Sequence, residues 1–275
     1  MKEFSHSEKL NLLPETQELL KSVQALTGMP VDIQPDPGIR GMGRAVYIAS
    51  ETSGNQSHRV LYDPLYEQFL DHHVAHECGH ILRLAAVDVN ERVALVTTSD
   101  HTENAALQLL PDIEELLERG DVSEDYLGKL LPLWLSGTIS QLYNTPADIH
   151  IERWIHQDYP TLRSTQTASI LSSAEQAHLV LNPMIEEVTP RHIWNVSNAM
   201  NYALFKSAIN LSGNNELIKP YKGTPAEILG EDLFEMIEST ADTGFEGDRQ
   251  LVDLWADKLE LQGWFTWQKY QRLAS

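Results

Sequence analysis

The segment HECGH, residues 76–80, constrains this chain more than any other feature of its sequence. It lies within residues 65–85, where apolar side chains recur at helical spacing and predict a helix. Because residues four apart on a helix project in nearly the same direction, His76 and His80 are expected on one face, one turn apart. The sequence therefore predicts a helix whose one face carries two imidazoles.

The opposite face of this predicted helix is apolar and can anchor it in a core. Gly79 inside a helix costs about 1 kcal/mol relative to alanine, so close packing is expected at that position. Cys78 points away from the histidine face and is expected to pack rather than to bind a ligand. The apolar residues on the anchoring side are Leu70, Val74, Ile81 and Ala85.

Two imidazoles in this arrangement have the geometry needed to bind one tetrahedral Zn²⁺ ion. Glu77 points roughly a quarter turn away, where it can take a proton from a water at the metal and pass it to a leaving amine. The alternative is an ordinary helix with His76 and His80 on its surface. The position of the motif inside a helix with apolar flanks favours the zinc site.

The sequence AHECGHILR, residues 75–83, resembles the active-site helix of the zincin metallopeptidases. Two predicted strands at residues 44–50 and 58–62 precede it, and this order also resembles the zincin fold. The resemblance implies hydrolysis of peptide bonds. It also implies an edge strand, either 44–50 or 58–62, that aligns an extended peptide beside the metal.

A catalytic zinc ion usually has three protein ligands, and the third must come from farther along the chain. The extended form of the motif is absent, since residues 83 and 86 are Arg and Ala. Asp148 and Glu152 are four residues apart and share a predicted helix face with apolar side chains. Because burying two carboxylates without a cation is costly, a metal would explain the pair.

This second segment resembles the helix of the gluzincin branch, in which a ligand carboxylate is followed four residues later by one that holds a zinc-bound histidine. The resemblance implies that Asp148 is the ligand and Glu152 the orienting residue. The usual order there is Glu then Asp, so the opposite assignment stays open. An acid in the first helical turn would explain Asp148 but not Glu152. His150, on the other side of the helix, is the weaker ligand candidate.

The fold class expected is α+β and zincin-like. A small α/β part, residues 1–98, contains the HExxH helix, and a mostly helical part, residues 99–275, supplies the third ligand; together they form one catalytic unit. Residues 15–28 are expected to be a helix ending at Gly28, residues 29–43 a loop and residues 86–98 another. Further helices are predicted at 103–119, 124–143, 146–158, 174–185, 190–211, 225–239 and 249–264.

The chain has 40 acidic and 20 basic residues, a formal charge of −20. Such a surface repels nucleic acid and anionic lipid, so neither is expected as a partner. The single cysteine excludes an intramolecular disulfide, and the N-terminal segment lacks the apolar stretch of a signal peptide. No apolar run is long enough to cross a bilayer. These features favour the cytoplasm.

Several other residues could have a role. His72 and His73, one turn before the motif, are expected to be partly exposed. Tyr143, His192 and Tyr202 are candidates to stabilise an oxyanion, although the sequence places none of them. The tryptophans near the C-terminus, at 255, 264 and 267, are expected in the core.

The function expected is zinc-dependent hydrolysis of a polypeptide substrate, with Glu77 activating a water and with His76, His80 and an acidic residue holding Zn²⁺. The alternative is a non-enzymatic regulatory or interaction protein of zincin fold with a structural metal. A closed site, for example with Asp148 and Glu152 both on the metal, would favour the alternative.

Overall fold

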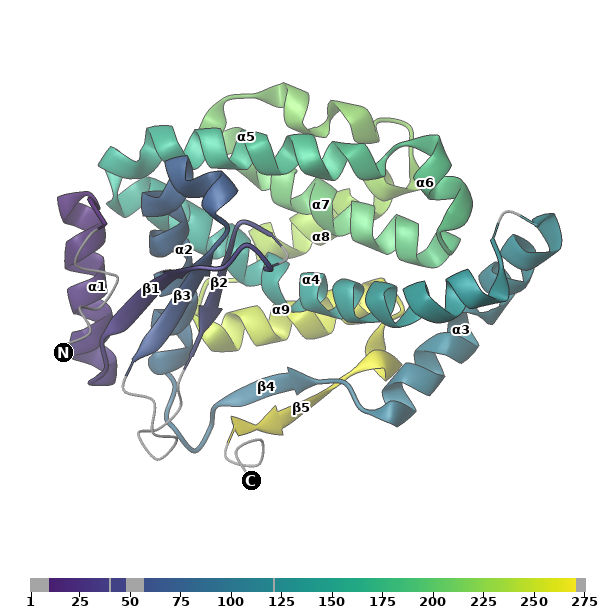
Figure 1. Ribbon diagram of the computed structural model, residues 1–275, viewed down its shortest axis with the longest axis horizontal. Helices are drawn as coiled ribbons and strands as arrows, with labels where there is room; N and C mark the ends of the chain where they lie inside the picture. The colour runs from purple at the N-terminus through teal and green to yellow at the C-terminus, as the bar shows by residue number, and fades with distance from the viewer. Residues whose placement is uncertain (1–9, 40, 48–56, 121, 271–275) are drawn as a thin grey trace. The chain divides into compact units, whose positions relative to one another are not determined.

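The computed structural model describes residues 10–39, 41–47, 57–120 and 122–270. Helices dominate, accompanied by two small sheets (Figure 1), which is an α+β arrangement. Residues 48–50, the end of the strand expected at 44–50, lie outside the described residues. Among the described helices, none combines the length and the apolarity needed to span a membrane.

The chain divides into two compact units. The first comprises residues 1–92 and 150–170, and the second comprises residues 93–149 and 171–275. The expected division at residue 98 groups residues 150–170 with the helical part, whereas by their contacts they cluster with the N-terminal part.

A three-stranded sheet and two helices form most of the first unit (Figure 1). The strand order is β1-β3-β2, with β2 antiparallel and β1 parallel to the central strand β3. The helices α1 and α2 pack against each other, and α2 also packs against β2 and β3. The bounds are Pro14–Thr27 for α1, Val31–Pro35 for β1, Gly43–Val46 for β2, His58–Tyr62 for β3 and Leu70–Ala85 for α2; a short 3-10 helix, Pro64–Phe69, precedes α2.

The expectation of a loop over residues 29–43 is wrong in part, because β1 lies there. Its prolines suggested a loop, but Pro35 is the last residue of an edge strand, where a missing N–H is tolerated. The β-branched Ile33 is fully buried in register with Val60 of β3, which explains why this segment pairs. The helix expected to end at Gly28 is confirmed: Gly28 adopts the left-handed conformation, with φ of 77°, after the last turn of α1.

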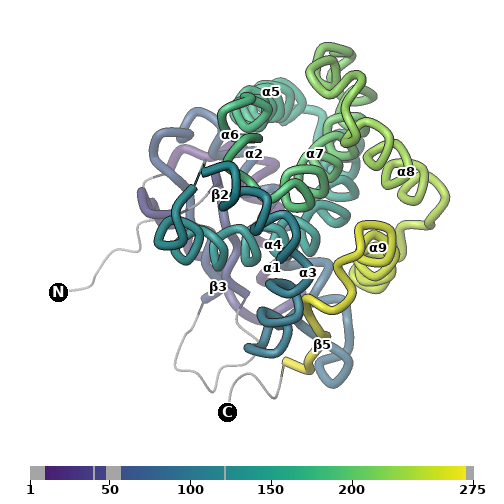
Figure 2. Tube along the Cα trace, turned by 90° about the vertical axis from the view of Figure 1, so that its right-hand side faces the viewer, coloured from purple at the N-terminus to yellow at the C-terminus, as the bar shows by residue number. Residues whose placement is uncertain are grey.

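The second unit contains most of the remaining helices and a two-stranded sheet. The helices α7 and α8 lie side by side (Figure 2), so closely that a Cβ at Gly230 would be 2.6 Å from Cδ1 of Tyr202. The bounds are Ser99–Arg119 for α3, Glu124–Asp158 for α4, Arg163–Val180 for α5, Pro183–Val188 for α6, Arg191–Ser212 for α7, Pro225–Ser239 for α8 and Phe245–Lys258 for α9, with 3-10 turns at Pro160–Leu162, Asn215–Tyr221 and Gln262–Trp264.

Helix α4 is continuous, so the break expected between residues 143 and 146 is wrong. Thr145 does not cap a helix there; its hydroxyl donates to the Gln141 carbonyl oxygen at 2.7 Å. Leu142 and Ile149 lie in the same buried core on either side of Pro146, and this packing holds the helix together despite the proline. Helix α4 belongs to the second unit up to Ile149 and to the first unit thereafter.

Other boundaries also differ from the sequence prediction. Helix α2 begins at Leu70 rather than at residue 65, after the 3-10 helix, and α3 begins at Ser99 rather than at residue 103. The segment 174–185 is not one helix, since α5 begins eleven residues earlier at Arg163 and α6 is separate. The expected loop 86–98 contains β4, Val93–Val96, which pairs antiparallel with β5, Thr266–Lys269. Partners so distant in sequence give no local pairing signal. The last helix ends at Lys258 rather than at residue 264.

Candidate metal centre

Helix α2 presents a stripe of three histidines, His72, His76 and His80, spaced four residues apart. The opposite side is buried in the first unit, where Val74 is 0% and Ile81 1% exposed. The amphipathic pattern that predicted the helix therefore also fixes the direction of the histidines.

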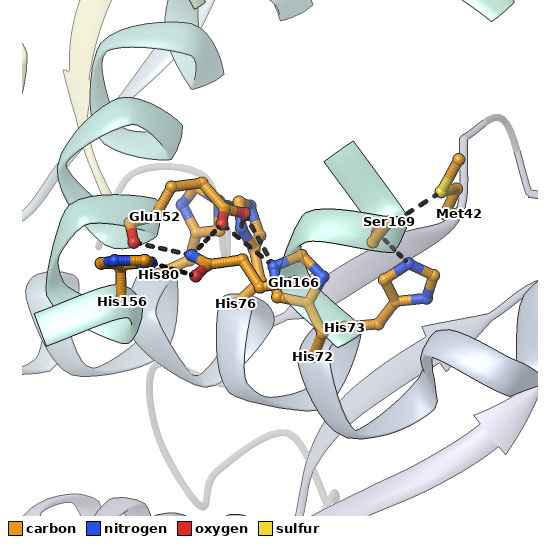
Figure 3. Close-up of polar contacts among 9 residues, drawn as sticks. All are labelled: Met42, His72, His73, His76, His80, Glu152, His156, Gln166 and Ser169. Atoms are coloured by element: carbon orange, nitrogen blue, oxygen red, sulfur yellow. Dashed lines mark hydrogen bonds and ion pairs between the residues drawn. The ribbon is translucent and has the colours of Figure 1, made fainter. Parts of the chain in front are cut away.

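His76 and His80 meet through their Nε2 atoms, which lie 3.3 Å apart (Figure 3). Two nitrogen ligands about 2.0–2.1 Å from a tetrahedral zinc ion are separated by about 3.3 Å. Their rings are 5.0 Å apart and inclined at 65°. The separation and the convergence of the two nitrogen atoms thus fit two ligands of one zinc ion.

The carboxylate of Glu152, on α4, lies beside this pair and accepts three hydrogen bonds. The donors are His76 Nδ1 at 2.8 Å, His72 Nε2 at 3.0 Å and Gln166 Nε2 at 2.6 Å. Because a carboxylate can only accept, His76 carries its proton on Nδ1 and has its Nε2 lone pair directed towards His80. Glu152 therefore fixes the ring orientation of His76, an arrangement that outer carboxylates also provide in zinc sites.

Glu152 is ionised in this setting. Burial alone would raise the pKa of its carboxyl group, but the electrostatic interactions and hydrogen bonds with His72 and His76 outweigh burial and hold the pKa well below its ordinary value. The side chain is only 8% exposed. A buried carboxylate with three donors needs no further cation to compensate its charge.

His72, His76 and Glu152 also offer ligand atoms within 4.8 Å of one another, a second set that could hold a metal. The separations that join them, 2.8 and 3.0 Å, are shorter than the spacing of ligands around tetrahedral zinc and match hydrogen bonds. This set therefore fits an orienting network better than a metal site.

Glu77 lies next to the N-terminal end of strand β2. A Cβ at Gly43 would be 3.0 Å from Glu77 Oε1 and 3.6 Å from Cβ of His73. Glu77 thus occupies the space that a side chain at Gly43 would need. The arrangement keeps the carboxylate at the edge of the sheet, on the helix that carries His76 and His80.

His73 is buried and faces Ser169 of α5, with 3.2 Å between Nε2 and the hydroxyl oxygen. Ser169 in turn approaches the sulfur of Met42 at 3.9 Å (Figure 3). Burial lowers the pKa of His73 to about 3, and the neighbouring His72 and His76 contribute in the same direction. The expectation that His72 and His73 are partly exposed is wrong, because they are 4% and 5% exposed.

Asp148 precedes Glu152 by one turn of α4 and is half-buried. It therefore lies on the same helix face as Glu152, as the sequence spacing predicts. His150 is buried and its Nδ1 is 3.3 Å from a guanidinium nitrogen of Arg83. Cys78 is fully buried, and burial, with the charge of Glu77, raises the pKa of its thiol.

The candidates for oxyanion stabilisation all belong to the second unit and have contacts there. Tyr202 donates its hydroxyl hydrogen to Glu231 at 2.9 Å. Tyr143 packs near the ring of Trp267, and His192 near the ring of Trp264. The core placement expected for the C-terminal tryptophans holds for residues 255 and 264, which are 0% and 1% exposed, while Trp267 is half-buried.

Sequence reasoning missed Gln166, Ser169 and His156. The first two lie on α5, in a segment with no recognisable motif; tertiary packing brings Gln166 to Glu152, and it brings Ser169 to His73, which is outside the hydrogen-bonded group of Glu152 and His76. His156 lies one turn after Glu152 on α4, and this four-residue spacing is the sequence signal that could have identified it.

Comparison with known proteins adds no relative: no family model matches the chain, and neither a curated protein nor a solved structure matches it. The function is therefore argued from the residues of the chain itself.

Proposed function

We propose that this chain is a zinc-dependent peptidase of zincin-like fold, in which His76 and His80 bind the metal. The observation that carries the proposal is the 3.3 Å approach of the two Nε2 atoms, in a stripe where His76 Nδ1 already donates to a carboxylate. A histidine held in this way offers its other nitrogen to a metal.

Asp148 is the third ligand in this proposal, and Glu152 is the residue that orients His76. The three hydrogen bonds that Glu152 accepts support this order, since they occupy most of the acceptor positions of its carboxylate. Asp148 lies one turn away on the same face of α4 and supplies the carboxylate. Three protein ligands leave one position for water, as a catalytic site requires.

Glu77 is the general base. It is on α2 next to His76, and it is 8% exposed at the edge of the sheet. A bound zinc ion would polarise the scissile carbonyl and lower the pKa of water. Glu77 takes the proton from that water and delivers it to the leaving amine, so that one water molecule is consumed for each peptide bond broken.

Strand β2 is the proposed binding strand for the substrate. Of the two strands expected for this role, residues 58–62 are excluded because β3 is the central strand and pairs on both sides. Strand β2 lies at the sheet edge, and its first residue, Gly43, is adjacent to Glu77. An extended polypeptide added to this edge would lie alongside the base.

The buried, unpaired Cys78 is in keeping with a cytoplasmic setting.

The test combines zinc content with turnover of an unstructured polypeptide such as casein. Wild-type protein is expected to hold close to one zinc ion per chain and to hydrolyse the substrate. Glu77→Gln should keep the zinc and lose about 10²–10⁴-fold in rate. Glu67→Gln, an exposed carboxylate just before α2, is the matched control and should behave as wild type.

Two results would reject the proposal. Equal turnover by wild type and Glu77→Gln would remove Glu77 from the chemistry. Zinc that is bound without any turnover, and that requires both Asp148 and Glu152, would indicate a closed structural site and a regulatory or interaction protein instead.

A further inference from the structure

Gln166, on α5, is fully buried between Glu152 and His156 (Figure 3). Its amide nitrogen donates to the Glu152 carboxylate at 2.6 Å and to the Glu152 backbone carbonyl at 2.8 Å. Its amide oxygen faces His156 Nδ1 at 3.2 Å. One side chain therefore contacts both the backbone and the carboxylate of the residue that orients His76.

The chemistry of these partners permits one orientation of the amide. The carboxylate and the carbonyl of Glu152 are both acceptors, so the nitrogen of Gln166 must face them. The oxygen then faces His156, which must donate from Nδ1. A hydrogen-bonded chain thus runs from His156 through Gln166 and Glu152 to His76.

We propose that Gln166 is a positioning residue for metal binding. It holds the Glu152 carboxylate at the rotation that accepts the Nδ1 proton of His76, and so keeps the Nε2 lone pair of His76 directed towards His80. This inference rests on the zinc site proposed above, and it adds a residue that contacts no proposed metal ligand directly.

His72 makes the contribution of Gln166 necessary. His72 Nε2 is 3.0 Å from each oxygen of Glu152 and competes with His76 for the same carboxylate. Gln166 fixes Oε2 from a second direction and is itself anchored to the backbone of α4, so it limits rotation towards His72. Without it, the carboxylate can turn to His72, and His76 loses the partner that selects its tautomer.

Two substitutions separate the amide's hydrogen bonds from its volume. Gln166→Met keeps a side chain of similar length but neither donates nor accepts strongly. Gln166→Glu puts acceptor oxygens where Glu152 needs a donor, and the two carboxylates repel. Since partners of metal-bound histidines typically change metal affinity 10–100-fold, we expect a zinc Kd weakened about 10-fold by Gln166→Met and more by Gln166→Glu.

Ser169→Ala is the matched control. Ser169 is buried on the same helix and hydrogen-bonds a histidine of α2, His73, rather than Glu152. Its zinc Kd, measured like the others by competition with a chromophoric chelator, should stay within about 2-fold of wild type, since its partner is not part of the chain that ends at His76.

A second measurement does not depend on the metal. In zinc-free protein, long-range ¹H–¹⁵N NMR spectra of the histidines report which ring nitrogen carries the proton. His76 should be protonated on Nδ1 in wild type and in Ser169→Ala, and should become a mixture of tautomers in Gln166→Met. If Gln166→Met does not fold, His156→Ala, at a half-buried position, is expected to show the same changes at smaller amplitude.

The outcomes separate this inference from the proposed function. If wild type binds no zinc, the peptidase proposal fails and the tautomer of His76 alone decides the role of Gln166. An unchanged tautomer together with a zinc Kd within 2-fold of wild type, in whichever of these variants folds, would overturn the inference even if the protein proves to be a peptidase.

Discussion

Ile151 of α4 fills the space that a side chain at Gly79 would occupy on α2. A Cβ at Gly79 would be 2.7 Å from Cγ2 of Ile151, which is well inside van der Waals contact. Because Ile151 is 1% exposed, it has no room to withdraw. The glycine inside the HExxH motif therefore allows α2 and the end of α4 to approach, which brings Glu152 against His76.

Gly79→Ala is therefore expected to destabilise the protein. Alanine gains about 1 kcal/mol of helix propensity, but overpacking against Ile151 should outweigh this gain and lower the free energy of unfolding by about 1–3 kcal/mol. Gly137→Ala is the control, since Gly137 lies inside α4 with open space around its Cβ position. Denaturant unfolding should show Gly137→Ala to be about 0.5–1 kcal/mol more stable than wild type. Equal effects of the two substitutions would argue against the close approach.

A second prediction concerns Arg92, which connects the end of α2 to the sheet. Its guanidinium donates to the carbonyl oxygens of Ala85 and Val87, each at 2.9 Å, and to the hydroxyl of Tyr47. Arg92→Met removes these bonds and should lower the free energy of unfolding by about 1–3 kcal/mol.

The matched control for Arg92 is Arg44→Met, at an exposed position of β2. It should stay within about 0.5 kcal/mol of wild type in the same denaturant unfolding experiment. If Arg92→Met were as neutral as Arg44→Met, the contacts of Arg92 would not contribute to holding α2 on the sheet.

The sequence predicted those parts of the centre that depend on one helix at a time. The spacing of His76 and His80 placed both on one face, and the spacing of Asp148 and Glu152 did the same on α4. Gly79 was expected to mark close packing, and the contact with Ile151 confirms it.

Contacts between segments distant in sequence could not be predicted in this way. Gln166 reaches Glu152 only because α5 folds back beside α4, and no periodicity in either helix encodes that approach. The strand β1 was missed because its prolines gave a stronger local signal than Ile33, whose burial depends on pairing with Val60, 27 residues later. The proline at 146 misled for the same reason, since core packing on both sides overrode its local preference.

Gly43 gives a third prediction, which rests on the proposed peptidase activity. Gly43→Ala places a methyl group 3.0 Å from Glu77 Oε1, so the carboxylate must move by a few tenths of an ångström. Because misplacing a catalytic group by 1 Å can cost about 10²-fold in rate, this smaller shift should lower kcat on the order of 10-fold. Zinc content and KM should stay as in wild type, and a wild-type kcat would show that Glu77 tolerates the shift.

The pH dependence of stability provides a fourth prediction, through His73. Its pKa is about 3 in the folded protein and 6.5 when unperturbed, so between these values the unfolded chain binds a proton that the folded protein does not. The free energy of unfolding must then fall as pH falls below 6.5, with a slope that approaches about 1.4 kcal/mol per pH unit.

Glu152 acts in a different range: its pKa is lowered from 4.5, so its contribution is present above pH 4.5 and is lost only below it. Burial also lowers the pKa of His58 and His192, so the contribution of His73 is the difference in slope between wild type and His73→Gln in denaturant unfolding of zinc-free protein at pH 7, 6 and 5. His73→Gln should be less sensitive to pH over this range than wild type, whereas Ser169→Ala, which removes the hydrogen bond but keeps the imidazole, should retain the wild-type slope. Identical slopes for wild type and His73→Gln would mean that His73 is accessible to protons in the folded protein.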